Sequence, residues 1–294
     1  MRSKGISGQY SVLFVLPAFC LFSLFFILPN LSGLVMAFTN WSSYFPLHPK
    51  FNGWRNFQDL FESPVFAISV RNTLIFTAAT TIVKIVVGFG LALILNNGVK
   101  YKNTYRTIIF SPFVFNPLVI AYVFSALYQP TFGPINTLLR HVGLGFLAQN
   151  WLTDTKYAMT AICVMDIWMS IGAIVVIFLT GLQSVPKEYY EAATVDGAGG
   201  ISKFRHITFP LTIYSLCINT ILCLIGGAKV FGQVYGLTNG GPADATQVYG
   251  TFIFKSFSSG LFGYSAAAGL LFTIVISLVS FITLGLFRRL EVDY

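Results

Sequence analysis

The sequence has few charged residues. Asp, Glu, Lys and Arg make up only 10% of its 294 residues, whereas a soluble domain carries about 25%. Hydrophobic residues account for 55% of the chain, and the mean hydropathy is +0.73. This shortage of charge excludes an ordinary soluble domain and predicts that most of the chain lies in a lipid bilayer. The net charge of +8 does not indicate nucleic acid binding, because the basic residues are scattered at the ends of apolar runs, where they orient a membrane protein.

Cysteine and histidine are also scarce. The four cysteines lie in apolar runs without the spacing of metal ligands, so we expect free thiols that pack as small hydrophobic side chains. The histidines are isolated from one another and from any nucleophile. These residues are Cys20, Cys163, Cys217, Cys223, His48, His141 and His206. The sequence therefore predicts no metal site, no cofactor and no catalytic centre.

Two further features are missing. The phosphate-binding loop Gly-x4-Gly-Lys-Ser/Thr is absent, so we do not expect this chain to bind ATP by the usual means. No internal repeat is visible, and the apolar runs contain a single carboxylate, Asp166. A secondary carrier usually has an internal repeat and an ion relay, so these absences argue against that class. A secondary carrier and a non-transporting membrane scaffold are the rival interpretations.

What the chain does contain is a series of apolar runs, each close to the 20 residues that a bilayer span needs. The predicted spans are residues 11–38, 71–95, 107–128, 157–183, 210–228 and 264–287. The prediction is an all-α membrane protein, with residues 1–294 forming one domain. Pro112 and Pro117 should bend the third span, either for packing or to line a cavity.

A polar stretch, residues 184–210, separates the fourth and fifth spans. Pro186 suits the first turn of a helix. Gly197, Gly199 and Gly200 should end that helix, because glycine accepts the left-handed conformation. We therefore expect a short helix, a glycine turn and a second short element. This could be an ordinary loop between spans or a surface that docks a partner.

The sequence of this stretch resembles the EAA motif of permease subunits of ATP-binding-cassette (ABC) importers. The matching positions are Glu191, Ala192, Ala193, Gly197, Ile207 and Pro210. Phe209 stands where the family usually has Leu. The resemblance implies the six-span, MetI-like fold of type I ABC importers, and it makes the segment a coupling helix that docks into an ATPase subunit. ATP hydrolysis would then belong to a separate subunit.

Other short segments outside the EAA motif resemble the corresponding segments of carbohydrate-type permeases. They are Phe51-Asn-Gly53, Asn56-Phe57, Asn72-Thr73, residues 128–136, and Thr238-Asn-Gly-Gly-Pro242. They resemble the first permease of the maltose and glycerol-phosphate importers. The resemblance implies sugar or oligosaccharide transport with a second permease, two ATPase subunits and an extracytoplasmic solute-binding protein. A permease for a non-sugar solute is the alternative.

The resemblance also implies roles for individual residues. The coupling residues would be Glu191, Ala192, Ala193, Asp196, Gly197, Ile207 and Pro210, with Glu191 at the ATPase and Gly197 setting the turn. The wall of the substrate path would carry Asp166, Met169, Ser170, Ala173, Cys223, Gly227 and Val230. Asp166 and Lys84 are ionisable groups inside spans, which favours a functional role. They could instead form a structural salt bridge or bind backbone carbonyls separately.

Lysine and arginine predict the orientation in a plasma or inner membrane, because short cytoplasmic loops carry an excess of both. If both termini lie in the cytoplasm, the basic residues on the cytoplasmic side are Arg2, Lys4, Lys100, Lys102, Arg106, Lys187, Lys203, Arg205, Arg288 and Arg289. The other side keeps Lys50, Arg55, Arg140, Lys156 and Lys255, with Arg71 at the boundary. Residues 184–210 then lie in the cytoplasm.

The predicted outer segment, residues 40–70, is aromatic and amphipathic. It could be a helix anchored at the headgroup level of the membrane or a contact for a protein that docks from outside. Residues 128–136 should break the third span and begin a short outer amphipathic helix. The Gly-Gly-Pro sequence at residues 240–242 predicts a tight turn.

Overall fold

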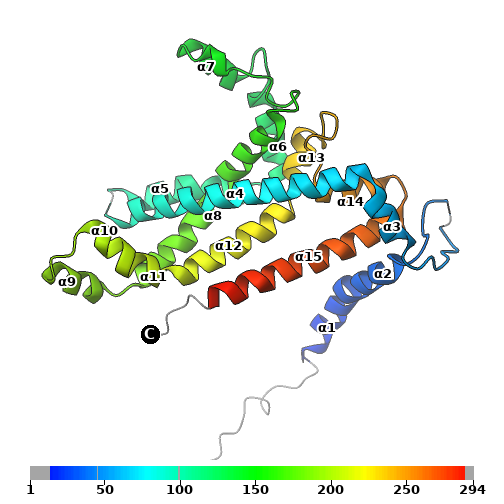
Figure 1. Ribbon diagram of the computed structural model, residues 1–294, viewed down its shortest axis with the longest axis horizontal. Helices are drawn as coiled ribbons and strands as arrows, with labels where there is room; N and C mark the ends of the chain where they lie inside the picture. The colour runs from blue at the N-terminus through cyan, green and yellow to red at the C-terminus, as the bar shows by residue number, and fades with distance from the viewer. Residues whose placement is uncertain (1–13, 45, 99, 289–294) are drawn as a thin grey trace, which may run out of the picture. The chain divides into compact units, whose positions relative to one another are not determined.

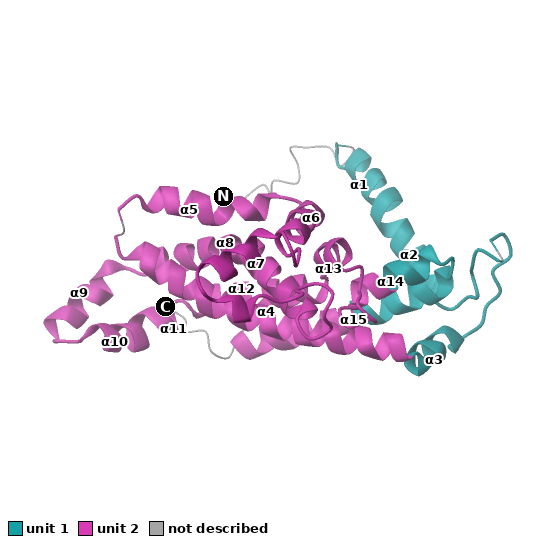
Figure 2. Ribbon diagram, turned by 90° about the horizontal axis from the view of Figure 1, so that it is seen from above, with its two compact units in different colours: residues 1–63, 253–273 teal, residues 64–252, 274–294 magenta. Residues whose placement is uncertain are grey.

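The computed structural model describes residues 14–44, 46–98 and 100–288. This part of the chain is helical, apart from one isolated β-bridge between Thr39 and Phe51. It forms two compact units, residues 1–63 with 253–273, and residues 64–252 with 274–294 (Figure 2). Arg2, Lys4, Arg289 and the start of the first predicted span lie outside the described residues.

The first unit contains an apolar N-terminal rod and a short amphipathic helix. The rod runs through α1 (Leu16–Phe22), the π-helical turn η3 (Ser23–Ile27) and α2 (Leu28–Met36), and none of its residues is buried. The amphipathic helix is α3 (Arg55–Glu62), which buries Asn56 and Leu60. Most of α14 (Tyr249–Ser258) and the first half of α15 (Phe262–Arg288) complete this unit.

The second unit is built on the two long helices α4 (Pro64–Asn96) and α8 (Ala158–Ser184), which pack against each other (Figure 1). The 27 residues of α8 reach about 40 Å at 1.5 Å per residue, more than the roughly 30 Å of a hydrocarbon core. Helix α12 (Ile213–Ala228) packs on both. A hydrophobic cluster around Phe178 joins these three helices. A second cluster, around Met165, joins α4 and α8 to residues 120–128 and 230–248.

Two predicted spans are bent. In the third, α5 (Lys102–Phe110) and the 3₁₀ turn η4 (Ser111–Val114) meet α6 (Pro117–Leu127) at 99°. The bend predicted from Pro112 and Pro117 is confirmed. Asn116 caps α6, because its side-chain oxygen accepts a hydrogen bond from the Leu118 N–H at 2.8 Å.

In the fifth span, the segment Gly200–Leu211 meets α12 at 63°. That segment consists of α10 (Gly200–Lys203), the π-helical turn η6 (Phe204–Thr208) and α11 (Phe209–Leu211). Four described helices are long and apolar enough to cross a membrane, and six spans result if each bent pair counts as one.

The remaining helices are short. They are α7 (Pro134–His141), the 3₁₀ turn η5 (Gly145–Leu147), α9 (Lys187–Val195) and α13 (Gly232–Leu237). The predicted amphipathic helix after residue 133 is confirmed as α7. The predicted tight turn is present as well, because the Gly241 N–H donates to the Thr238 carbonyl at 2.9 Å. All four cysteines are free thiols, as expected.

Candidate functional site

The polar stretch after α8 folds into a short helix with a glycine-dependent end. The Gly197 N–H donates to Thr194 O at 3.1 Å, and the Ala198 N–H donates to Ala193 O at 2.8 Å. Gly197 has a φ of +76°. This pair of hydrogen bonds, with glycine in the left-handed region, is the Schellman motif, which satisfies the last carbonyls of a helix. The prediction that Gly197 ends this helix is confirmed.

Three details of the predicted turn were wrong. Gly199 and Gly200 do not adopt the left-handed conformation: Gly199 is the extended N-cap of α10 and Gly200 is its first residue. One left-handed residue is enough to reverse the chain, so the next two glycines are free to begin another helix. Pro186 is the extended N-cap of α9 rather than a residue of its first turn.

One face of α9 is held against the segment that leads into α12. The Tyr190 hydroxyl and Thr208 Oγ1 lie 3.0 Å apart, and Thr208 is buried. Lys203 Nζ donates to Thr194 Oγ1 at 2.8 Å. These two links join the helix to the second short element, so both elements behave as one projecting unit, which we call the α9–α11 knob (residues 186–211).

The opposite face of the knob is open. Glu191, Ala192, Asp196 and Gly197 are exposed, and Ala193 is half-buried. Val195 and Ile201 are 88% and 86% exposed. Sequence reasoning missed these last two residues, because an apolar side chain in a short polar segment can equally well point inward. Exposed apolar side chains next to small residues form a surface suited to another protein.

Aromatic side chains connect the knob to the long helices. Phe204 lies 6.0 Å from Phe89 of α4 and 6.2 Å from Phe209, measured between ring centroids. Phe89 in turn packs edge-on against Phe178 of α8 at 4.9 Å. The motif residues Ile207 and Pro210 are half-buried within η6 and α11. The knob thereby packs directly against α4 and, through Phe89, is connected to α8.

Inside the second unit, Lys84 of α4 and Asp166 of α8 form a buried ion pair. Lys84 Nζ and Asp166 Oδ2 are 2.7 Å apart, and both side chains are 6% exposed. Gln233 Nε2 of α13 donates to Asp166 Oδ1 at 2.9 Å. Of the alternatives left open by the sequence, the direct salt bridge is the one observed. Gln233 was not predicted, because it lies 67 residues further along the chain.

The other residues expected along a substrate path lie mostly in packed surroundings. Met169 and Val230 belong to the cluster around Met165, and Cys223 belongs to the cluster around Phe178. Gly227 is buried, and a Cβ there would meet the Thr77 backbone at 3.0 Å. Ser170 and Ala173 are half-buried. A role for this set in a substrate path stays a prediction.

Comparison with known proteins places these features in context. Residues 84–292 match the family described as binding-protein-dependent transport system inner membrane component. The chain is 34% identical over 279 residues to the "Probable ABC transporter permease protein YurN" of Bacillus subtilis, covering 94% of this chain and 95% of the relative. It is 30% identical to the "Multiple sugar-binding transport system permease protein MsmF" of Streptococcus mutans, covering 98% and 99%.

Solved structures show the same fold. A chain of a bacterial alginate ABC transporter, in complex with an alginate pentasaccharide-bound periplasmic protein, superposes with a TM-score of 0.81 at 23% identity, covering 94% of this chain and 93% of that one. A chain of the MetNI methionine ABC transporter in inward-facing conformations gives a TM-score of 0.51 at 15% identity, covering 76% and 95%. The predicted ABC importer permease fold is confirmed.

Proposed function

We propose a function that starts from family membership: the chain belongs to the binding-protein-dependent transport system inner membrane components, the permeases of ABC importers. It is therefore a multi-pass membrane protein and the permease component of its transporter rather than the ATPase. This membership removes the secondary carrier and the non-transporting scaffold from consideration. The substrate, the partners and the orientation are the parts that we propose below.

The transported solute is a sugar or oligosaccharide. The support is the relative from Streptococcus mutans, whose name specifies multiple sugar-binding transport and which aligns over almost the whole of both chains. The phrases at residues 51–57 and 238–242 resemble carbohydrate-type permeases and support the same substrate class. The chain forms the translocation path together with a second, different permease. An extracytoplasmic solute-binding protein delivers the sugar.

The α9–α11 knob is the coupling element for a pair of ATPase subunits. The observation that supports this role is the exposure of Glu191, Ala192, Val195 and Ile201. The small Ala192 and Ala193 allow close approach of the ATPase, and Glu191 contacts the rim of its groove. ATP binding closes the ATPases, and the knob passes that movement through Phe204 to α4 and α8. The ATPase drives transport by binding the two conformations of the permease with different affinity.

The knob lies in the cytoplasm, and both termini lie on the same side. The basic residues near the ends of the apolar helices support this orientation. Asp166, Met169, Ser170, Ala173, Cys223, Gly227 and Val230 lie along the sugar path when the cavity between the two permeases opens.

The test is purification and uptake with a Glu191→Lys variant. The tagged permease should bring down an ATPase and a second permease, and the complete transporter should take up a neutral oligosaccharide only with ATP and the binding protein. Glu191→Lys should remove ATP-dependent uptake while leaving the protein in the membrane. The matched control is Glu62→Lys, which makes the same charge change at an exposed position of α3.

Uptake that is unchanged in Glu191→Lys would contradict the coupling role. ATP-dependent uptake of a different solute, with no response to any sugar, would contradict the substrate class and leave the transporter assignment in place.

A further inference from the structure

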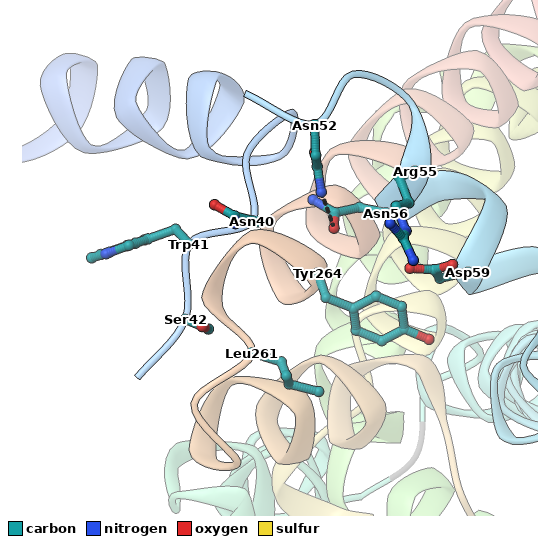
Figure 3. Close-up of a pocket in the computed structure, with 9 residues that line it drawn as sticks. All are labelled: Asn40, Trp41, Ser42, Asn52, Arg55, Asn56, Asp59, Leu261 and Tyr264. Atoms are coloured by element: carbon teal, nitrogen blue, oxygen red, sulfur yellow. Dashed lines mark hydrogen bonds between the residues drawn. The ribbon is translucent and has the colours of Figure 1, made fainter. Parts of the chain in front are cut away.

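The first unit contains a polar pocket of about 460 Å³ that none of the proposed transport roles uses. It lies between the chain that follows α2, the helix α3 and the start of α15. Its lining residues are Asn40, Trp41, Ser42, Asn52, Arg55, Asn56, Asp59, Leu261 and Tyr264 (Figure 3). This volume is within the range of about 300–1,000 Å³ that is usual for small-molecule sites.

The walls of the pocket are fixed by hydrogen bonds. Asn56 Nδ2 donates to the carbonyls of Ala37 and Thr39, both at 2.8 Å. The Gly263 N–H donates to Trp41 O at 2.8 Å. Gly263 leaves no room for a Cβ beside the Thr39 backbone, so the three segments meet closely. A pocket with fixed walls loses little conformational entropy when a ligand binds.

Several polar groups of the pocket are left without a partner. Neither the Arg55 guanidinium nor the Asp59 carboxylate makes an ion pair or a side-chain hydrogen bond within the described part of the chain. Asn52 Nδ2 donates to Asn56 at 3.2 Å, but the Asn52 Oδ1 acceptor is buried and receives no hydrogen bond there. Buried polar groups normally find a partner, so the Asn52 Oδ1 acceptor indicates a ligand that donates a hydrogen bond. Arg55 and Asp59 are exposed, and they offer a donor and an acceptor to the same ligand.

The lining also indicates the charge of that ligand. The pocket carries one cation, Arg55, and one anion, Asp59, so it has no net charge with which to select a phosphate or an ammonium group. Tyr264 lies on the same side as these two residues, whereas the Trp41 side chain extends away from them (Figure 3). Tyr264 is tied to Ser63 by a side-chain hydrogen bond, which fixes its ring as a flat apolar wall.

We propose that this pocket is an accessory binding site for a neutral saccharide on the outer side of the permease. Sugar hydroxyls donate and accept at once: they would donate to Asp59 and Asn52 Oδ1 and accept from Arg55. The flat face of the sugar ring would lie on Tyr264. The site holds a sugar unit on residues of the first unit, none of which belongs to the proposed sugar path. This inference rests on the proposed sugar transport and on the proposed orientation.

The test uses the full-length chain in lipid nanodiscs with maltotriose and raffinose as neutral probes, observed by saturation-transfer NMR. At least one probe should bind, and Asp59→Ala and Arg55→Ala should each weaken binding by about tenfold, the effect of losing one charge-assisted hydrogen bond. The matched control is Glu62→Ala, a change of an exposed carboxylate on the same helix that does not line the pocket.

The inference is overturned if neither trisaccharide binds or if Asp59→Ala binds as well as Glu62→Ala. It is also overturned if native mass spectrometry shows that Asp59→Ala loses a bound phospholipid while sugar binding persists. Uptake by the complete transporter separates the two proposals. If the complete transporter takes up sugar in response to ATP, but Asp59→Ala binds the trisaccharides as well as the unaltered chain does, only the pocket proposal is refuted. Absence of ATP-dependent uptake for every sugar refutes the proposed substrate.

Discussion

The ion pair between Lys84 and Asp166 is buried, with both side chains 6% exposed, so each charge depends on the other. Breaking a buried pair by removing one partner costs about 3–5 kcal/mol, because an uncompensated charge remains. We therefore expect Asp166→Leu to lower the free energy of unfolding strongly, since Lys84 and Gln233 both lose their partner. The measurement is an SDS unfolding titration of the purified permease, compared with the unaltered chain.

The double variant Lys84→Met/Asp166→Leu is the matched control for that prediction. It removes both charges and should be more stable than Asp166→Leu alone, because replacing a whole buried pair with apolar side chains is often nearly neutral. If the loss of unfolding free energy in the double variant equals the sum of the losses in the two single variants, the two residues act independently.

Gly197 is the second residue on which the site depends. Its φ of +76° costs an L-residue with a Cβ roughly 1–2 kcal/mol. No atom lies within 4 Å of the place a Cβ would take, so the cost comes from the backbone alone. We expect Gly197→Val to reduce the ATPase recovered with the permease and to lower ATP-dependent uptake, because the end of α9 would be distorted.

Two variants separate this effect from a general loss of glycine. Gly197→Asn should retain most of the activity, because asparagine enters the left-handed region more readily than other residues. Gly200→Ala should have little effect, since Gly200 has no positive φ and open space surrounds it. Equal loss in Gly197→Val and Gly200→Ala would contradict this account.

At the scale of elements, α9 depends on its contact with η6. The hydrogen bond between Tyr190 and Thr208 Oγ1 is worth about 1 kcal/mol if it resembles other neutral pairs. Tyr190→Phe should therefore raise hydrogen–deuterium exchange in residues 187–208 by roughly fivefold. The control is Tyr189→Phe, because Tyr189 is 47% exposed. Faster exchange in both variants would mean that the hydroxyl of Tyr190 is not what holds the helix.

Most elements could be predicted because they depend on local chemistry. Each predicted apolar run is largely helical within the described residues, although the third and fifth are broken by a bend. Hydropathy over 20 residues could predict these runs because it needs no knowledge of distant parts of the chain. Pro112 and Pro117 predict a break for the same reason, because proline removes a backbone donor wherever it stands. The size of the bend, 99°, depends on packing and could not be predicted.

Most features built from distant segments were beyond sequence reasoning, although the salt bridge between Lys84 and Asp166 was one of its alternatives. Gln233 reaches Asp166 across 67 residues, and the pocket joins residues near 40, 55 and 264. Nothing local in the sequence indicates that these residues meet. The motif around Glu191 could be found because its residues are close in the chain, whereas the exposure of Val195 and Ile201 required the fold.

At the scale of the whole molecule, the function depends on which side of the membrane carries the knob. Phe132 precedes α8 and Val195 follows it, and both are highly exposed, at 85% and 88%. Because α8 is long enough to cross the bilayer once, these two positions should face opposite compartments. In a cysteine-free background, Phe132→Cys should react with a membrane-impermeant maleimide added to intact cells. Val195→Cys should react only after the cells are permeabilised. Labelling of Val195→Cys in intact cells would place the knob outside, beyond the reach of cytoplasmic ATPases, and would refute the coupling role.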